Sequence, residues 1–302
     1  MSAVGVRRTF GPVEAVRGID FTAPPGEVTA LVGPNGAGKT TLLLVLATLL
    51  VPDAGTVSVA GHDPVTEPDA VRARMGWSPD VFGLYDNLTA REYLVFMGEA
   101  YRLGAARSRA RAEELLDQAR LGDRADRPVH EMSRGQKQRL GLVRALVHEP
   151  QVLLLDEPAS GLDPRSRVEL RELLRSLARA GTTVIVSSHL LGDLEELADR
   201  VVFVDQGATV GEHRIDQLPQ SFARRPWRLR SLDVDALVAT LDRNGYDRDA
   251  PTPAGVDVRL ASDEAAAQLL AGLVRDGVPV VSCQPLGGDL EAAYLTLTEQ
   301  VR

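Results

Sequence analysis

The chain has 302 residues, enough for one large or two modest domains, and a formal net charge of −8. Charges of both signs are interspersed, which argues against a nucleic-acid-coating surface, because such a surface needs a basic face. A single cysteine, Cys283, excludes an internal disulfide and favours a reducing cytosol. The N-terminal residues lack the apolar stretch of a signal peptide, and the apolar run at 42–51 is about half the length that crosses a bilayer. We therefore expect a soluble protein, for which any membrane role requires a separate partner.

Residues 33–41 (GPNGAGKTT) match the P-loop pattern G-x-x-x-x-G-K-[ST], which binds phosphates. We predict a short apolar strand at 27–32 before it and a helix at 39–50 after it, the context that this motif requires. The glycines allow a tight turn whose N–H groups point at phosphate oxygens, and the helix N-terminus adds its positive dipole end. The alternative is a glycine-rich turn that only connects strand to helix.

Within this loop, Lys39 is expected to reach the β- and γ-phosphates, and the hydroxyl of Thr40 to ligate Mg²⁺. The predicted phosphate-binding residues are Gly33, Pro34, Asn35, Gly36, Ala37, Gly38, Lys39, Thr40 and Thr41.

A second apolar strand, at 152–158 (VLLLDEP), ends in two carboxylates. A buried parallel strand delivers its last side chains to the carboxyl edge of the sheet, where ligands bind in open α/β folds. Asp156 is therefore predicted to hold Mg²⁺, directly or through water, and Glu157 to orient or deprotonate the attacking water. An apolar strand capped by acids is common, so this prediction depends on the P-loop upstream.

Between these motifs lies MSRGQKQRLGLVRAL, at 132–146. Ser133 can cap a helix there, and a serine with Gly135 at a helix N-terminus forms a second anion site. Here the chain resembles the ATP-binding cassette (ABC) ATPases, whose signature is LSGGQ, with Met132 and Arg134 as the two departures. The resemblance implies that Ser133, Gly135 and Gln136 meet a γ-phosphate, whereas Arg134 leaves binding intact but can alter rate or partner contacts.

The resemblance also assigns roles elsewhere. Phe10 matches the aromatic residue that stacks on adenine, although an ordinary core or edge phenylalanine is the alternative. Asp163 ends the loop SGLD that follows the catalytic glutamate and, standing before a proline, can also cap the next helix. His189, after a strand at 183–187, matches the switch histidine that contacts the γ-phosphate.

One position departs from the family pattern. After a strand at 75–78 the family usually has a glutamine that touches Mg²⁺ and the attacking water, and Asp80 stands there instead. An ionised aspartate can ligate the metal but cannot donate a hydrogen bond, so its catalytic contribution is open. The segment that follows, 83–89, fits the one that touches a membrane partner.

The predicted fold class is α/β: a P-loop ABC cassette at 1–222, with a mixed sheet and a helical subdomain at about 88–148, followed by a small α/β domain at 223–302. A hairpin is expected at 201–213 and a linker at 219–226. In the C-terminal domain we predict strands at 227–232, 256–260 and 278–284 and helices at 234–243, 263–275 and 290–298; a ferredoxin-like fold is one candidate.

The resemblance implies an ATP-binding and ATP-hydrolysing subunit of an ABC transporter that uses ATP and Mg²⁺. Two copies would bind head to tail around two ATP molecules and drive a separate integral-membrane permease from the cytoplasmic face, with no nucleic acid as partner. The segment 290–298 (LEAAYLTLT) resembles the tail of bacterial ABC ATPase subunits that pair with drug- or polymer-exporting permeases, and this resemblance favours an exporter. Two alternatives remain: a soluble ABC ATPase acting on ribosomes or DNA, which usually has a second cassette or a long coiled-coil insertion, and an import-type subunit, which shares every catalytic motif.

Overall fold

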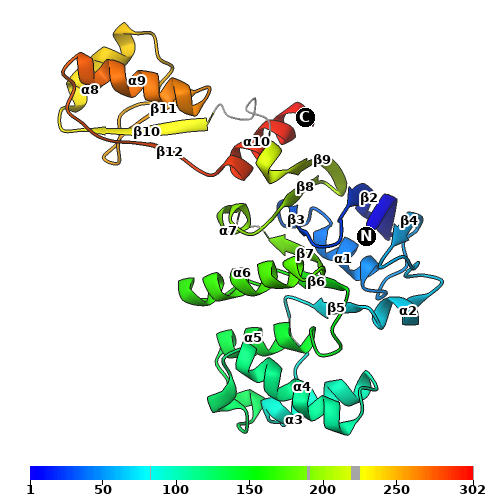
Figure 1. Ribbon diagram of the computed structural model, residues 1–302. Helices are drawn as coiled ribbons and strands as arrows, with labels where there is room; N and C mark the ends of the chain where they lie inside the picture. The colour runs from blue at the N-terminus through cyan, green and yellow to red at the C-terminus, as the bar shows by residue number, and fades with distance from the viewer. Residues whose placement is uncertain (82, 189–190, 219–224, 302) are drawn as a thin grey trace. The chain divides into compact units, whose positions relative to one another are not determined.

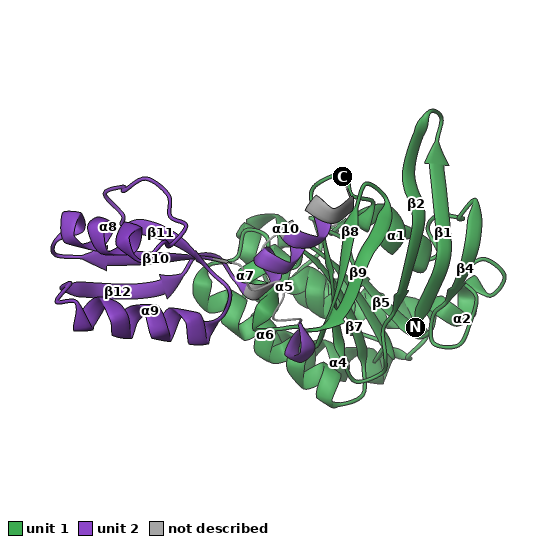
Figure 2. Ribbon diagram, turned by 90° about the horizontal axis from the view of Figure 1, so that it is seen from above, with its two compact units in different colours: residues 1–214 green, residues 215–302 purple. Residues whose placement is uncertain are grey.

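The computed structural model describes residues 1–81, 83–188, 191–218 and 225–301, and the chain divides into two compact units, Met1–Arg214 and Ile215–Arg302 (Figures 1 and 2). The first unit therefore ends at the last residue of a strand, β9 (Ala208–Arg214), whereas the sequence placed the boundary at 222. Most of the expected linker lies outside the described residues.

Nine strands form one mixed sheet in the described part of the first unit, in the order β4-β1-β2-β9-β8-β3-β7-β6-β5. β5, β6, β7, β3 and β8 run parallel, while β1 pairs antiparallel with both β2 and β4. Their bounds are β1 (Ser2–Phe10), β2 (Val13–Thr22), β3 (Val28–Val32), β4 (Ala54–Ser58), β5 (Met75–Ser78), β6 (Val152–Asp156), β7 (Thr183–Ser188) and β8 (Arg200–Asp205).

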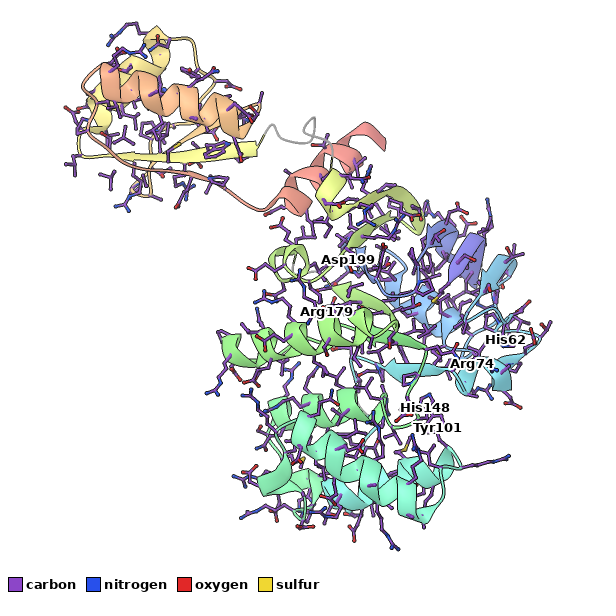
Figure 3. All side chains as sticks on the ribbon, viewed as in Figure 1. His62, Arg74, Tyr101, His148, Arg179 and Asp199 are labelled. Carbon is purple, nitrogen blue, oxygen red and sulfur yellow. The ribbon has the colours of Figure 1, made fainter. Side chains whose placement is uncertain are left out.

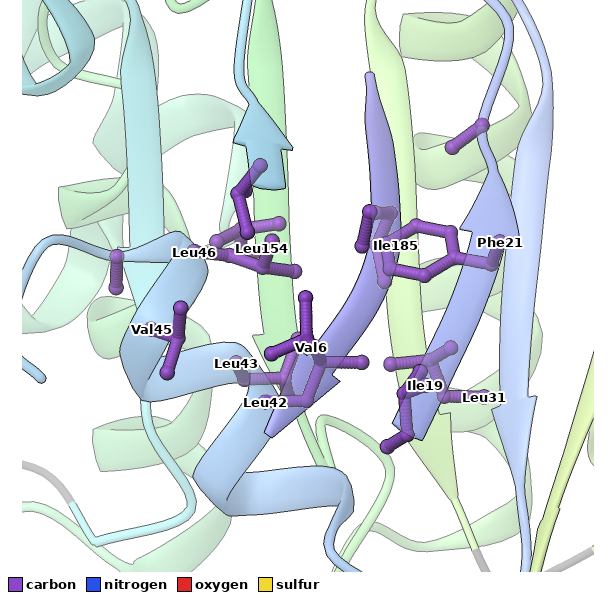
Figure 4. Packing of buried hydrophobic residues seen from close by; sticks show 14 of the residues in the cluster. Val6, Ile19, Phe21, Leu31, Leu42, Leu43, Val45, Leu46, Leu154 and Ile185 are labelled. Carbon is purple, nitrogen blue, oxygen red and sulfur yellow. The ribbon is translucent and has the colours of Figure 1, made fainter. Parts of the chain in front are cut away.

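Every residue of β3, β6 and β7 is buried, as expected for parallel strands covered on both faces. On one face, α1 (Lys39–Leu46) packs Leu42, Leu43 and Leu46 into a cluster with the strands (Figure 4). On the other face, α6 (Pro164–Arg179) contacts β3 and β7 and buries Leu170 and Leu174. The parallel strands are thus covered by helices on both faces, and their carboxyl ends lie together at one edge of the sheet.

Three further helices lie in the range where the helical subdomain is predicted: α3 (Ala90–Ala100), α4 (Ala105–Gln118) and α5 (Arg134–Arg144). Gly104, at φ 82°, separates α3 from α4. His148 stacks on Tyr101, with ring centroids 3.8 Å apart and 6° between the planes, and joins the end of the subdomain to the sheet by a 3.1 Å contact between its Nε2 and the Met75 carbonyl (Figure 3). Burial lowers the pKa of His148, which favours the neutral imidazole in this stack.

The remaining helical segments of the first unit are short. They are α2 (Pro68–Arg72), α7 (Leu191–Glu195) and the 3-10 turns Gly122–Arg124 and Val129–Glu131; a further 3-10 turn, Ile215–Gln217, opens the second unit. No helix among the described residues is long and apolar enough to cross a membrane.

The predicted hairpin is confirmed, whereas the helix predicted at 39–50 is wrong in length. The hairpin turns at Gln206 and Gly207, whose φ angles of 46° and 83° suit a tight two-residue connection. The helix predicted to reach residue 50 ends at Leu46, because Thr48 adopts a left-handed φ of 62°. The apolar run continues past this point, and hydrophobicity alone does not mark a helix end.

The second unit has its own apolar core around Trp227, Leu237, Val258 and Leu269. Its three named strands are ordered β11-β10-β12, all pairs antiparallel, and a short bridge of Arg248 to Val258 adds a fourth segment beside β11. This β-α-β-β-α-β order is that of a ferredoxin-like arrangement. The elements are β10 (Arg225–Ser231), α8 (Val234–Arg243), β11 (Val256–Leu260), α9 (Asp263–Arg275), β12 (Val280–Pro285) and α10 (Asp289–Val301).

Candidate active site

The P-loop and the two acids meet at the carboxyl edge of the parallel strands. A cleft of about 430 Å³ opens there between the end of β3, the end of β6 and the start of α1. Ten predicted site residues line it together with Val13, Glu14 and Ala15: Asn35, Gly36, Ala37, Gly38, Lys39, Thr40, Thr41, Asp80, Asp156 and Glu157. The sequence motifs, up to 122 residues apart, therefore share one concave surface.

Glycine is required in the P-loop for two different reasons. Gly36 and Gly38 have φ angles of 84° and 99°, which side-chain-bearing residues rarely adopt. A Cβ at Gly33 would lie 2.1 Å from the Val204 carbonyl oxygen, so that position allows no side chain although its φ is ordinary. The P-loop therefore packs closely against Val204 of β8, and the left-handed conformations of Gly36 and Gly38 determine its turns.

Lys39 is buried, 7% exposed, and its ammonium is held by the loop that precedes it. Nζ donates to the carbonyl oxygens of Gly33 at 2.6 Å and Pro34 at 3.1 Å. Burial lowers the pKa of Lys39, and the charges of Glu157 and Asp156 act in the opposite direction. An ammonium has three donor hydrogens, so these two bonds leave a donor for a phosphate oxygen.

The carboxylate of Asp156 is held by two hydroxyl groups. Thr40 Oγ1 donates to one oxygen at 2.9 Å, and Ser187 Oγ donates to the other. Ser187 is placed there by the register of β7 against β6, in which it lies opposite Asp156. The hydroxyl of Thr40 and the carboxylate of Asp156 are hard oxygen ligands in direct contact, which fits a magnesium ion.

Glu157 follows directly and has a left-handed φ of 49°, uncommon for a residue with a side chain. Its N–H donates to Ser187, at 3.1 Å to the carbonyl oxygen and 3.2 Å to the hydroxyl. The backbone thus turns sharply out of the strand at this residue, and the carboxylate lines the cleft. Strained residues of this kind cluster at catalytic sites.

Phe10 ends β1 beside this region, but it does not line the cleft. Phe10 is 45% exposed, and the Arg8 guanidinium carbon lies 5.0 Å from the centroid of its ring. Arg8 is fixed in turn by Asp53, with 2.6 Å between Nη1 and Oδ1, and Asp53 also accepts from the Thr9 N–H at 2.7 Å. The Thr9 N–H, followed by Arg8, lowers the pKa of Asp53.

Four other expected residues do not line the cleft: Ser133, Gly135, Gln136 and Asp163. Ser133 caps α5 through a capping box: its N–H donates to Gln136 Oε1 at 2.9 Å, and its Oγ accepts from the Gln136 N–H at 3.3 Å. Asp163 caps α6, accepting from the Ser166 N–H at 3.0 Å and hydroxyl at 2.7 Å, and the Ser166 hydroxyl and N–H lower the pKa of Asp163. Gly135 follows Ser133 on α5, and His189 lies outside the described residues.

Two contributions were not predicted. Ser187 donates to the Asp156 carboxylate and accepts from the Glu157 N–H, and the sequence signal for it is only that it ends the strand predicted at 183–187. Val13, Glu14 and Ala15 reach the cleft because the β1–β2 hairpin folds beside the P-loop, where a Cβ on Gly38 would come within 2.6 Å of the Ala15 carbonyl oxygen. Neither contact follows from spacing along the chain.

Comparison with known proteins agrees with this geometry. A family model described as ABC transporter matches residues 16–160. The daunorubicin/doxorubicin resistance ATP-binding protein DrrA of Streptomyces peucetius is 36% identical over 305 residues, covering 97% of this chain and 91% of that protein. DrrA3 of Streptomyces coeruleorubidus, a daunorubicin resistance ATP-binding protein, is 44% identical over 71% of this chain and 68% of its own length. A Nod factor export ATP-binding protein of Paraburkholderia xenovorans is 41% identical over 68% of each chain.

Solved structures show the same fold. The ATP-binding subunit of an ABC transporter superposes with a TM-score of 0.68 at 28% identity, covering 80% of this chain and 98% of that one. A dimeric bacterial ABC transporter cassette, MJ0796, gives a TM-score of 0.66 at 25% identity over 71% of this chain and 98% of that chain. The chain therefore belongs to the ABC transporter family, as one of its ATP-binding, ATP-hydrolysing subunits.

Proposed function

We propose that this ATPase powers an exporter, closing as a head-to-tail dimer around two ATP molecules to drive a separate membrane permease. One observation carries the proposal: the cleft unites the P-loop with Asp156 and Glu157 but excludes Ser133, Gly135 and Gln136. A second copy can supply those three residues to the open side of the cleft. The names of the relatives, which specify drug resistance and Nod factor export, support the direction of transport.

Within one chain, each group has a distinct task. The N–H groups of the P-loop and the helix end of α1 bind the phosphates, and Lys39 neutralises the charge that develops at the transferred phosphoryl group. Glu157 orients the attacking water and accepts its proton, and Thr40 and Asp156 hold Mg²⁺, whose charge stabilises the phosphate oxygens when it is bound. Asp80 lines the same cleft as a further oxygen ligand. Phe10, backed by Arg8, offers its ring to the adenine.

In the dimer, each chain has to present the second half of the nucleotide site to the other copy. Ser133 and Arg134 can do this because they are exposed at the start of α5. The capping box holds the N–H groups of this helix end in a fixed direction, where they can bind a γ-phosphate held by the other copy. Each γ-phosphate would then be bound by the P-loop of one chain and by the start of α5 of the other. ATP would therefore stabilise the dimer, and hydrolysis of ATP would allow the two chains to separate.

The permease would contact the helical subdomain. Tyr85 and Phe96 are 54% and 46% exposed and pack edge-to-face beside a groove lined by residues of the segment 84–88. Exposed aromatic side chains beside a groove are typical anchors of a protein interface. This contact would hold the chain on the cytoplasmic face of the membrane. Co-purification with a hydrophobic permease separates this proposal from a soluble ABC ATPase, and transport in vesicles of known orientation separates export from import.

The Glu157→Gln variant tests the proposal directly. It keeps the size and the hydrogen-bonding reach of the side chain but cannot accept the proton, so we expect turnover to fall roughly 100-fold or more. ATP binding persists, and light scattering with ATP and Mg²⁺ should show a dimer that ADP does not produce. Near wild-type turnover would remove Glu157 as the base, and a monomer under all conditions would contradict the dimer.

A further inference from the structure

Helix α5 touches the loop that follows Glu157 in the same chain. Gln138 is buried, and its Nε2 donates to the Pro158 carbonyl oxygen at 2.8 Å. One helical turn earlier, the position of Gly135 faces Leu162, whose Cδ2 lies 3.8 Å from where a Cβ would stand. The start of the helix therefore packs along the loop 158–162.

Arg134 makes the most specific of these contacts. Its guanidinium lies over Gly161: a Cβ there would stand 2.8 Å from Nε and 3.1 Å from Cζ of Arg134. Nη2 is also 3.5 Å from Ser160 Oγ, which makes packing rather than hydrogen bonding the main contribution. Gly161 has a φ of 73°, so glycine is favoured there by its conformation as well as by the arginine above it.

This contact joins two parts that serve different nucleotides. In the proposed head-to-tail dimer, the segment 133–136 closes the site of the other copy, whereas the loop 158–162 follows the Glu157 of its own site. A glycine at position 134, as in the LSGGQ signature, has no side chain to reach the loop. Arg134 therefore adds a side-chain contact to the ones that Gly135 and Gln138 already make with this loop.

We propose that Arg134 is a positioning residue that couples the two nucleotide sites through the loop 158–162. Nucleotide bound on the other copy fixes the start of α5, and Arg134 transmits that position to the loop 158–162, directly after Glu157. Arg134 should then raise the cooperativity of ATP hydrolysis by the dimer. The inference rests on the proposed head-to-tail dimer.

The dependence of hydrolysis rate on ATP concentration tests the coupling in wild type, Arg134→Gly and Arg134→Lys. A dimer that closes around two ATP molecules is itself cooperative, so we expect the Hill coefficient to stay above 1 in Arg134→Gly but to lie below the wild-type value. Arg134→Lys should restore part of the lost cooperativity, since a long cationic chain can still cover Gly161. ATP affinity of the monomer, measured with a fluorescent ATP analogue, should stay within about twofold, because Arg134 lies outside the cleft of its own chain.

One outcome overturns this inference alone. The Hill coefficient of Arg134→Gly would equal that of wild type, while the double variant Arg134→Gly/Glu157→Gln would still dimerise with ATP. A Glu157→Gln chain with Arg134 intact that never dimerises with ATP overturns the proposed dimer and the coupling with it.

A double-mutant cycle checks the contact itself. Gly161→Ala carries the same left-handed strain whether or not Arg134 is present, but only with Arg134 does the new methyl group meet a guanidinium. We therefore expect Gly161→Ala to lower the hydrolysis rate more in wild type than in Arg134→Gly, because the exposed guanidinium then has to move off the loop. Equal effects in both backgrounds would show that Arg134 does not lie over Gly161, and would overturn the inference.

Discussion

The P-loop and the start of α5 are both glycine-containing helix starts, yet they are built in opposite ways. The P-loop is enclosed: Lys39 is buried and bonded back to the loop, and Gly33 and Gly38 press against neighbouring backbone. The start of α5 is exposed and is held by its own capping box. The difference indicates that one half of the nucleotide site is finished within the chain, while the other half is presented to a partner.

The largest expected effect comes from the enclosed half. Lys39→Ala removes the buried cation that faces the phosphates, and we expect ATP hydrolysis to fall roughly 100-fold or more. Lys137, which is paired with Asp86 at 3.2 Å on the helical subdomain, provides a matched control. Lys137→Ala should leave the ATP affinity of the monomer unchanged in a titration with a fluorescent analogue. If Lys39→Ala bound ATP as tightly as Lys137→Ala does, Lys39 would not face the phosphates.

A second pair of variants separates backbone strain from close packing in the P-loop. Gly36→Ala meets open space, whereas the same change at Gly38 places a Cβ 2.6 Å from the Ala15 carbonyl oxygen. Both add left-handed strain, so the clash should make Gly38→Ala the more destabilising by about 1–3 kcal/mol. Chemical denaturation of the two proteins measures the difference, and a smaller loss at Gly38 would mean that the β1–β2 hairpin does not pack on the loop.

Ser133→Ala tests the exposed half. Loss of the cap should destabilise the start of α5 by about 1 kcal/mol, visible as faster amide exchange there. Nucleotide binding to the monomer should be unaltered, while ATP-dependent dimerisation in the Glu157→Gln background weakens. If Ser133→Ala weakened nucleotide binding to the monomer as much as it weakened dimerisation, the P-loop and the start of α5 would not be separate halves of the nucleotide site.

The smallest effect concerns Phe10. The Thr9 N–H and Arg8 lower the pKa of Asp53 in the folded chain, so its ion pair with Arg8 contributes above the unfolded carboxylate pKa of about 3.9 and is lost as the pH falls through the lower folded value. We expect wild type and Asp53→Asn to differ slightly in ATP affinity at neutral pH and to converge on acidification. A difference that grows in acid would contradict the support of Phe10 by Asp53.

The sequence was most informative where local chemistry decides the structure. The P-loop spacing, the apolar strand before Asp156 and the capping pattern after Ser133 are local, and the corresponding elements formed at those residues. The left-handed Glu157, its support by Ser187 and the packing of Arg134 on Gly161 depend on which strands and helices become neighbours in space. Strand order is not encoded by spacing along the chain, so these contacts required the structure.

The claim that the site is shared between two chains is tested most directly by mixing two inactive variants. Lys39→Ala damages the enclosed half and Ser133→Arg the exposed half, so neither chain alone builds an intact shared site. In a mixed dimer, one site combines both defects and the other site has none, so ATP hydrolysis should reappear. If the copies pair at random, about half of the dimers are mixed and each has one intact site of two, so the rate should reach up to about a quarter of the wild-type rate. A mixture no more active than the sum of its two components, with mixed dimers demonstrably present, would contradict a site completed by the second copy.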